Sequence, residues 1–168
     1  MDAKVVELLN AQIGKEFYSA YLYLSISNFF HNASLDGFGK WYNIQAKEEV
    51  DHGAKIVKYL LDRDQKVKMD AIDAPPAEFE NFRAPIEMAL KHELYVSSLI
   101  NTLYGVAKDA RDYPSCQFLD WYLAEQVEEE KNAHELLSKY DLTGGDARAL
   151  FLLDEYLNKR EYTPLAQN

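Results

Sequence analysis

Four glutamates and one histidine stand in stripes of the sequence that otherwise read as buried and apolar. In four segments, residues spaced alternately three and four apart are mostly apolar, as in the helices of a bundle. Each stripe is interrupted by one glutamate, namely Glu16, Glu49, Glu93 and Glu129, and His52 follows Glu49 by three. Burying an unpaired carboxylate is costly, and like charges in one layer repel one another. These side chains therefore need a positively charged partner.

A pair of metal ions is the simplest such partner. No lysine or arginine occupies the stripes near the glutamates. Four carboxylates with one imidazole and no thiolate form a hard, oxygen-rich ligand set, which suits iron or manganese better than structural zinc. Glu49 and His52 share one helical face, so Glu49 can bridge two metals while His52 binds one of them. The alternative is a set of buried carboxylates satisfied by hydrogen bonds alone.

Four long helices are predicted to carry these residues. Hydrophobic periodicity and the positions of proline and polar breaks indicate helices over residues 3–31, 36–64, 85–111 and 115–140. Asp36 is expected to cap the second helix. The connection over residues 65–82 lacks periodicity, and its roughly 18 residues at ~3.3 Å each could span ~60 Å, beyond the ~40 Å length of its neighbouring helices. The second and third helices are therefore expected to run parallel.

This topology predicts that the four glutamates meet near the middle of a bundle. At ~1.5 Å per residue, their heights along the bundle axis agree within ~8 Å. Gly144 and Gly145 stop the fourth helix, and Asp146 can cap a short fifth helix over about 146–159. The predicted fold class is all-α, with residues 1–168 as one domain that consists of a bundle over about 3–140 and the added helix.

The same residues resemble the ferroxidase motifs of ferritins, and with the fifth helix the resemblance covers nearly the whole chain. The matching positions are Glu16, the Glu49-x-x-His52 pair, Glu93 and the Glu125-Gln126-x-x-Glu129 segment. The resemblance implies a ferritin-like bundle with one long crossover. It also implies that Glu16 and His52 hold a first iron, that Glu49 bridges, and that Glu93 with Glu129 serves a second iron.

Tyr23 and the residues around Gln126 refine this resemblance. Tyr23, seven residues after Glu16, matches the tyrosine beside the ferritin site and is either a packed aromatic or a catalytic electron donor. Gln126 resembles the bacterial non-haem ferritins, which implies a third iron site. Its candidate ligands, shared with Glu129, are Glu48, Glu125 and Glu128, and Gln126 is counted with the metal-site residues; the alternative is a solvated acidic face.

No haem is expected, because this chain departs from the bacterioferritin pattern at both diagnostic positions. Asn132 stands where bacterioferritins have a histidine, and Val50 stands where they have the haem-binding methionine. The other histidines, His31, His92 and His134, are expected at the surface or at helix ends. The implied cofactor is thus iron alone.

The resemblance implies an iron-storage ferritin that oxidises Fe(II) with oxygen or hydrogen peroxide and deposits a ferric mineral inside a homo-oligomeric shell of 24 subunits. The apolar fifth helix, with Phe151, Leu152 and Tyr156, is expected to need neighbours on several sides, as at a four-fold axis. A di-iron oxidase or peroxidase of ferritin-like fold without mineral storage is the alternative function. A signalling bundle gives no reason to bury four glutamates together.

Composition limits the compartment and the partners. The 168 residues carry a net charge of −10, which disfavours nucleic acid and anionic membranes and favours cations. The single cysteine, Cys116, cannot form an internal disulfide or a thiolate cluster, and residues 1–13 lack a signal-peptide pattern. No apolar run reaches the ~20 residues that a membrane span needs. The sequence therefore predicts a soluble protein in the cytoplasm.

Overall fold

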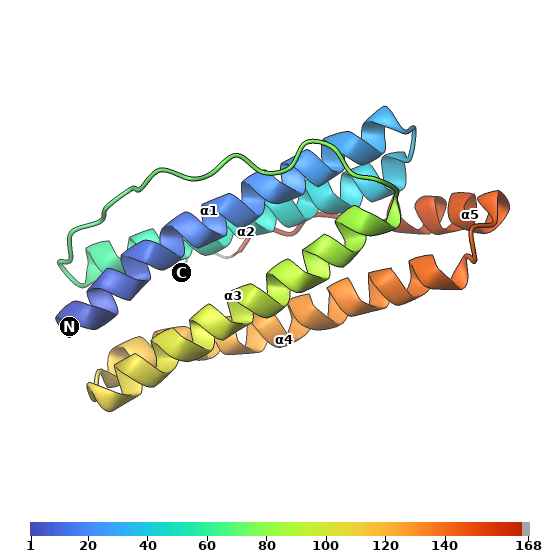
Figure 1. Cartoon of the computed structure of the whole chain (residues 1–168). Helices are drawn as coiled ribbons and strands as arrows, with labels where there is room; N and C mark the ends of the chain where they lie inside the picture. The colour runs from blue at the N-terminus through green and yellow to red at the C-terminus, as the bar shows by residue number, and fades with distance from the viewer. Residues whose placement is uncertain (166–168) are drawn as a thin grey trace.

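In the computed structural model, which describes residues 1–165, the chain forms five helices and no strand (Figure 1). Their bounds are α1 (Ala3–Asn32), α2 (Asp36–Asp62), α3 (Arg83–Asp109), α4 (Tyr113–Leu142) and α5 (Ala147–Leu157). The four long helices lie side by side, with α1 packed on α2 and α3 packed on α4. The predicted all-α bundle with a short fifth helix is confirmed.

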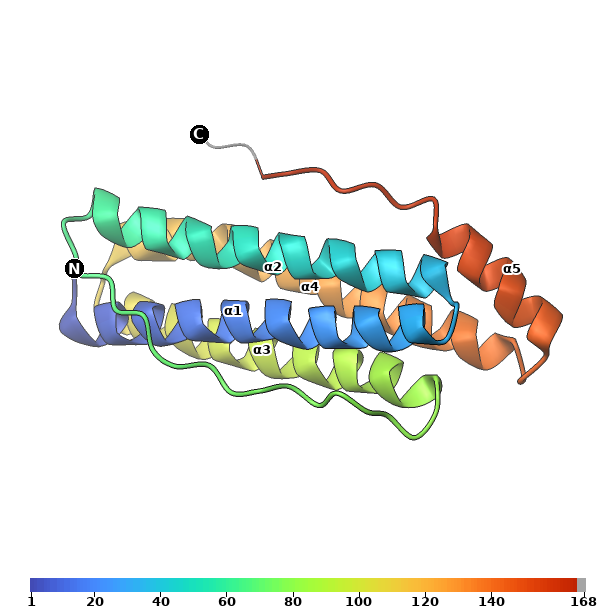
Figure 2. The ribbon, with the colours of Figure 1, turned by 90° about the horizontal axis from the view of Figure 1, so that it is seen from above.

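The long connection between α2 and α3 runs along the outside of α1 from one end of the bundle to the other (Figures 1 and 2). Asn10 fastens its beginning, since the amide donates to the Lys66 carbonyl at 3.2 Å and accepts from the Lys68 backbone N–H at 2.6 Å. Farther along, the Ser25 hydroxyl donates to the carbonyl of Pro76. This anchored crossover makes α2 and α3 parallel, as predicted.

The apolar core consists of two clusters, one toward each end of the bundle. One cluster includes Phe30, Phe38 and Ile86, and the other includes Leu9 and Ile100. Each fully buried side chain of this size contributes roughly 1.5–3 kcal/mol to stability. The glutamates fall between the two clusters in sequence and in space, so the site sits where the apolar packing is interrupted.

The start of α2 is capped in a way that the sequence does not reveal. The predicted cap by Asp36 is wrong, because Leu35 occupies the N-cap position and Asp36 instead pairs with His31 at 2.8 Å. Asp154 of α5 caps the helix instead, since its Oδ1 accepts a hydrogen bond from the backbone N–H of Phe38 at 2.9 Å. The Asp154 side chain is buried, with 7% exposed. The cap therefore depends on the docking of an element more than a hundred residues away.

The turn before α5 matches the prediction. Gly144 and Gly145 both have positive φ, which glycine adopts without a steric penalty. Asp146 caps α5 by accepting from the backbone N–H of Ala149 at 2.8 Å. The docked helix leaves large apolar side chains outside, with Phe151 60% and Leu152 59% exposed. Within the described residues, no helix combines the length and apolarity that crossing a membrane requires.

Candidate metal centre

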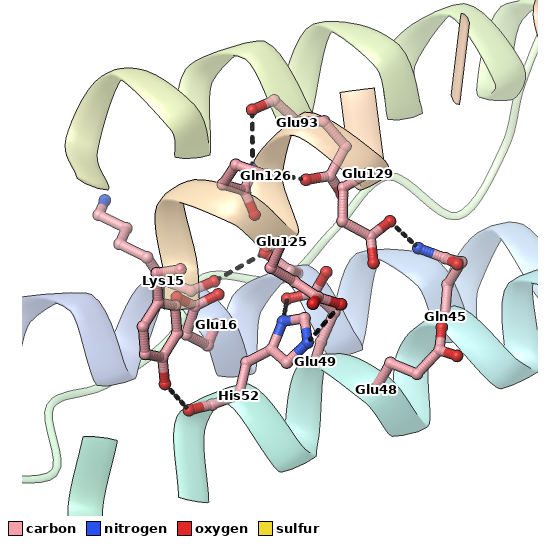
Figure 3. Close-up of polar contacts among 12 residues, drawn as sticks. Lys15, Glu16, Gln45, Glu48, Glu49, His52, Glu93, Glu125, Gln126 and Glu129 are labelled. Atoms are coloured by element: carbon pink, nitrogen blue, oxygen red, sulfur yellow. Dashed lines mark hydrogen bonds and ion pairs between the residues drawn. The ribbon is translucent and has the colours of Figure 1, made fainter. Parts of the chain in front are cut away.

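The five central residues reach one buried layer from all four bundle helices (Figure 3). Glu16 comes from α1, Glu49 and His52 from α2, Glu93 from α3 and Glu129 from α4. Each of these side chains is at most 4% exposed. The three-residue spacing on α2 places Glu49 and His52 on one face, with 3.5 Å between Glu49 Oε2 and His52 Nδ1.

The potential ligand atoms form two triplets that share His52. Glu16, Glu49 and His52 each offer an atom within 4.8 Å of the others, and so do His52, Glu125 and Glu129. The second ring nitrogen of His52 lies 3.8 Å from Glu125 Oε1. The imidazole thus stands between two groups of carboxylates, each close enough together for a single cation to contact all of its members.

Glu93 lies in the buried layer but belongs to neither triplet. Its carboxylate accepts a hydrogen bond from the Tyr23 hydroxyl on one side and from the Gln126 amide at 3.2 Å on the other. The Gln126 amide also lies 3.2 Å from the Ser97 hydroxyl oxygen. Tyr23 and Gln126 therefore border the layer and hold the Glu93 side chain in this arrangement, and the metal-binding role of Gln126 and the catalytic role of Tyr23 stay predictions.

Several residues that support the layer were not predicted as site residues. The Gln12 amide donates to Glu16 at 3.0 Å, and the Gln45 amide donates to Glu129 at 2.7 Å. The Tyr122 hydroxyl donates to the backbone carbonyl of His52 at 2.7 Å. Spacing holds a signal for Gln12, which precedes its partner Glu16 by four, whereas Gln45 bonds to a residue of another helix. The Tyr122 contact joins α4 to α2 and has no local signal in the sequence.

Burial raises the pKa of every central carboxyl, and repulsion between carboxylates adds to it for Glu49, Glu93 and Glu129. Burial raises the pKa of Glu16, with the His52 ring and the Gln12 amide acting against it. Burial followed by the charges of Glu93 and Glu16 raises the pKa of Glu49 well above 4.5. Burial also raises the pKa of Glu93, and burial with the charge of Glu93 raises that of Glu129 to about 8. At neutral pH this layer holds protons that a cation would displace.

The described part of the chain offers these carboxylates no basic side chain as a partner. Throughout residues 1–165, Glu16, Glu49, Glu93 and Glu129 have no lysine or arginine nitrogen within 4.0 Å. Lys15, next to Glu16 in sequence, directs its ammonium over the ring of Tyr95, 5.7 Å from the centroid. The layer has the oxygen-rich chemistry and the charge deficit that a hard divalent cation fills.

The three residues predicted for an additional metal position are placed differently from one another. Glu125 joins His52 and Glu129 in the second triplet. Glu48 is partly buried and directs its carboxylate to Arg160 at 2.7 Å, while Glu128 is exposed and outside both triplets. The structure therefore brings one of the three next to the central layer and leaves two outside it.

His92 differs from the surface position expected for it. It is only partly exposed and lies between α1 and α3, where Nε2 is 2.8 Å from the Ser19 hydroxyl and the ring packs 5.6 Å from that of Tyr18. Burial, followed by the charge of Lys15, lowers its pKa from 6.5 to about 4. His92 is consequently neutral at physiological pH and supports the packing around Tyr23.

The sequence and the fold are similar to those of known ferritins. A family described as ferritin-like domain matches residues 6–143. The chain is 37% identical to a bacterial non-haem ferritin of Campylobacter jejuni, over 94% of both chains, and 34% identical to one of Staphylococcus saprophyticus, over 96% and 97%.

Solved structures lead to the same family. An open-pore ferritin from the archaeon Archaeoglobus fulgidus superposes with a TM-score of 0.94 at 40% identity, covering 96% of this chain and 99% of that one. An engineered closed form of the same ferritin gives a TM-score of 0.95 at 40% identity, with 97% and 99% covered. The chain belongs to the ferritin family.

Proposed function

We propose that this ferritin oxidises Fe(II) at the buried carboxylate layer and stores the Fe(III) as a mineral inside a shell of its own copies. Iron storage follows from membership of the ferritin family, and oxidation is the chemistry that the site adds. The observation that carries this proposal is the pair of triplets that share His52 in a layer without a basic partner among the described residues. Two Fe(II) ions are the substrate of each chain.

The first triplet is the better defined of the two positions. Glu16, Glu49 and His52 offer two carboxylates and one imidazole, and all three are buried. Glu129 and Glu125 present carboxylates on the other side of His52, where the second ion is held. Glu49 lies closest to a bridging role because it borders His52 and feels the charges of both Glu16 and Glu129.

Hard carboxylate ligands favour oxidation because they stabilise the higher charge of Fe(III). Two Fe(II) ions together supply two electrons, which reduce dioxygen to hydrogen peroxide or hydrogen peroxide to water. Either reduction consumes two protons. Carboxyls with raised pKa values, such as Glu129 and Glu49, release protons when the ions bind and so provide a local source.

Glu93 and Tyr23 have roles that depend on each other. Tyr23 is fully buried, and its hydroxyl donates to the Glu93 carboxylate. Burial and the charge of Glu93 raise the pKa of Tyr23, so its phenol remains protonated. Glu93 would turn from Tyr23 and Gln126 toward the second ion as that ion binds. An electron from Tyr23 would go to the oxidant in addition to the two from the Fe(II) pair, with the phenol proton passing to Glu93.

A third iron position would lie beside the second, where Glu125 and Glu129 are already together and Glu48 and Glu128, which lie outside the layer in this structure, would turn toward the ion. Glu125 lies next to both Glu129 and His52. Burial raises the pKa of Glu125, and the charge of Glu128 raises it further. Glu125 is partly buried and Glu128 is exposed, so these carboxylates lie between the buried layer and the surface.

Assembly into a closed shell of 24 chains is the form of storage that we propose. The exposed apolar face of α5, with Phe151, Leu152 and Tyr156, supports packing against copies of the same helix. A chain that remained monomeric would leave this face in water. The storage function therefore requires a native mass far above that of a single chain.

Stopped-flow oxidation tests the proposed chemistry. The wild type should oxidise about two Fe(II) per chain in a fast phase that saturates at that ratio. Replacing Glu49 or His52 by alanine should abolish the fast phase, whereas a Glu78→Ala control, at an exposed position in the crossover, should retain it. Equal fast phases in all four proteins would refute the site. A native mass near that of a monomer with oxidation retained would favour a di-iron oxidase or peroxidase without mineral storage.

A further inference from the structure

The segment after α5 returns along the outer side of α2 and does not continue away from the bundle (Figure 2). Its beginning is held by Lys40, whose ammonium donates to the Asn158 carbonyl at 2.7 Å. Farther on, the Tyr162 hydroxyl donates to Asp51, and Lys47 lies over the Tyr162 ring. We call residues 158–165 the return segment. Contacts at both ends fix its course over α2.

Arg160 lies between these two anchors and contacts both Trp41 and Glu48 of α2. Its guanidinium stacks on the ring of Trp41, 4.1 Å from the centroid, and Nη1 donates to the Trp41 carbonyl at 3.5 Å. Nη2 donates to Glu48 Oε2 at 2.7 Å, and the two paired side chains are only 17% and 23% exposed. Stacking and partial burial make this pair more persistent than an ordinary surface ion pair.

The pair couples the return segment to the metal centre. Glu48 is next to Glu49 in sequence and one turn before His52 on α2, and its carboxylate is the group that Arg160 contacts. For the part of the chain that the structure describes, Arg160 is the only arginine or lysine within 4.0 Å of a carboxylate assigned to the third iron position. A carboxylate oxygen that accepts the guanidinium cannot give the same lone pair to a metal ion.

We propose that Arg160 competes with the third metal ion for Glu48, so that the return segment regulates the passage of iron out of the buried layer. This inference rests on the proposed function of the layer. When the third ion is absent, the guanidinium neutralises Glu48 and the return segment stays on α2. When the ion binds Glu48, it draws on the carboxylate charge that holds Arg160, so the pair with the guanidinium weakens. By linkage, release of Arg160 and tighter binding of the third ion accompany each other.

The test is a titration of the assembled, iron-free protein with Zn²⁺, which binds without changing its oxidation state. Isothermal titration calorimetry would count the ions bound per chain and give the affinity of each class of site. Arg160→Ala should tighten the third site by roughly 5- to 10-fold, the range expected when a partly buried cation stops competing. The two tighter sites should keep their affinities.

Matched variants separate competition from a general change of charge. Lys159→Ala removes the same charge from the neighbouring, exposed residue and should leave all sites as in the wild type. Arg160→Lys keeps a positive charge without the guanidinium fork and should give an intermediate affinity. In a Glu48→Gln background, Arg160→Ala should change nothing, because the shared carboxylate is gone.

The role of Arg160 would be overturned if Arg160→Ala left the Zn²⁺ affinity of the third site unchanged, or changed it by the same factor as Lys159→Ala. That role is also overturned if neither the wild type nor Arg160→Ala binds a third ion while both bind two, and the two-ion chemistry would then stand. Absence of the two tight sites from the wild type would instead refute the proposed function itself. Native mass and circular dichroism would establish that each variant is assembled and folded.

Discussion

Replacing Glu129 by glutamine should raise the stability of the metal-free protein and lower its affinity for divalent metal ions. Glu129 is 4% exposed, and burial with the charge of Glu93 raises its pKa from 4.5 to about 8. At pH 7 the carboxyl is ionised in the unfolded chain and protonated in the folded one. Glutamine keeps the size of the side chain and can accept the Gln45 hydrogen bond through its carbonyl.

The size of the effect follows from the two pKa values. The cost of this carboxyl to folding is absent below about pH 4.5, where both states are protonated. It grows as the pH rises toward 8 and is constant above that. At pH 7 it amounts to about 3 kcal/mol, so Glu129→Gln should raise the free energy of unfolding by about that much at pH 7 and by little at pH 4.5.

Urea unfolding of iron-free protein, at equal chain concentration in both variants, measures this difference. With saturating Zn²⁺ the wild type should become the more stable of the two, since metal binding to the ionised carboxylate adds more to its free energy of unfolding. A Glu129→Gln variant that is less stable than the wild type at pH 7 without metal would refute the reasoning. A stability difference that does not change between pH 4.5 and 7 would refute it too.

Three further predictions concern proton release and the docking of α5. Metal binding should release more protons at pH 6.5 than at pH 9, because Glu129 carries a proton for the metal to displace only below its pKa of about 8. Calorimetry in buffers of different ionisation enthalpy measures the number of protons released, and equal release at the two pH values would contradict the prediction. Asp154→Ala should lower the free energy of unfolding by about 1–2 kcal/mol in urea, since the Phe38 N–H loses its cap; an unchanged midpoint would show that the cap is dispensable. Gly37→Ala should detach α5 and reduce the native mass, because the added Cβ would lie 1.8 Å from the Asp154 carbonyl oxygen, whereas Gly14→Ala, with nothing within 4 Å, should keep the wild-type mass.

Periodic features of the chain were predictable from the sequence. The four long helices, the crossover over residues 65–82 and the parallel direction of α2 and α3 follow from spacing and from loop length, and the structure confirms them. The common height of the glutamates follows from the same geometry, because the rise per residue of a helix is fixed. Fold and family could therefore be inferred before any coordinates.

Features that depend on contacts between distant segments were not predictable. The cap on α2 comes from Asp154 rather than the local Asp36, and that contact exists only after α5 has docked. Likewise, nothing near Arg160 in the sequence indicates that it pairs with Glu48, which is more than a hundred residues earlier. The direction of the Glu93 side chain toward Tyr23 was similarly hidden, because spacing places a residue on a face without setting its rotamer.

The most direct test of the central claim is an anomalous-scattering map, at the iron absorption edge, of crystals loaded with Fe(II) in the absence of oxygen. The account predicts two iron peaks per chain within the buried layer, on either side of His52 and apart from any iron at the third position, with ligand atoms at roughly 2.0–2.2 Å, a distance typical of divalent transition metals. Glu16 and Glu49 should contact the first ion, and Glu129 should contact the second. Iron found only at exposed carboxylates, with none in the buried layer, would contradict the account.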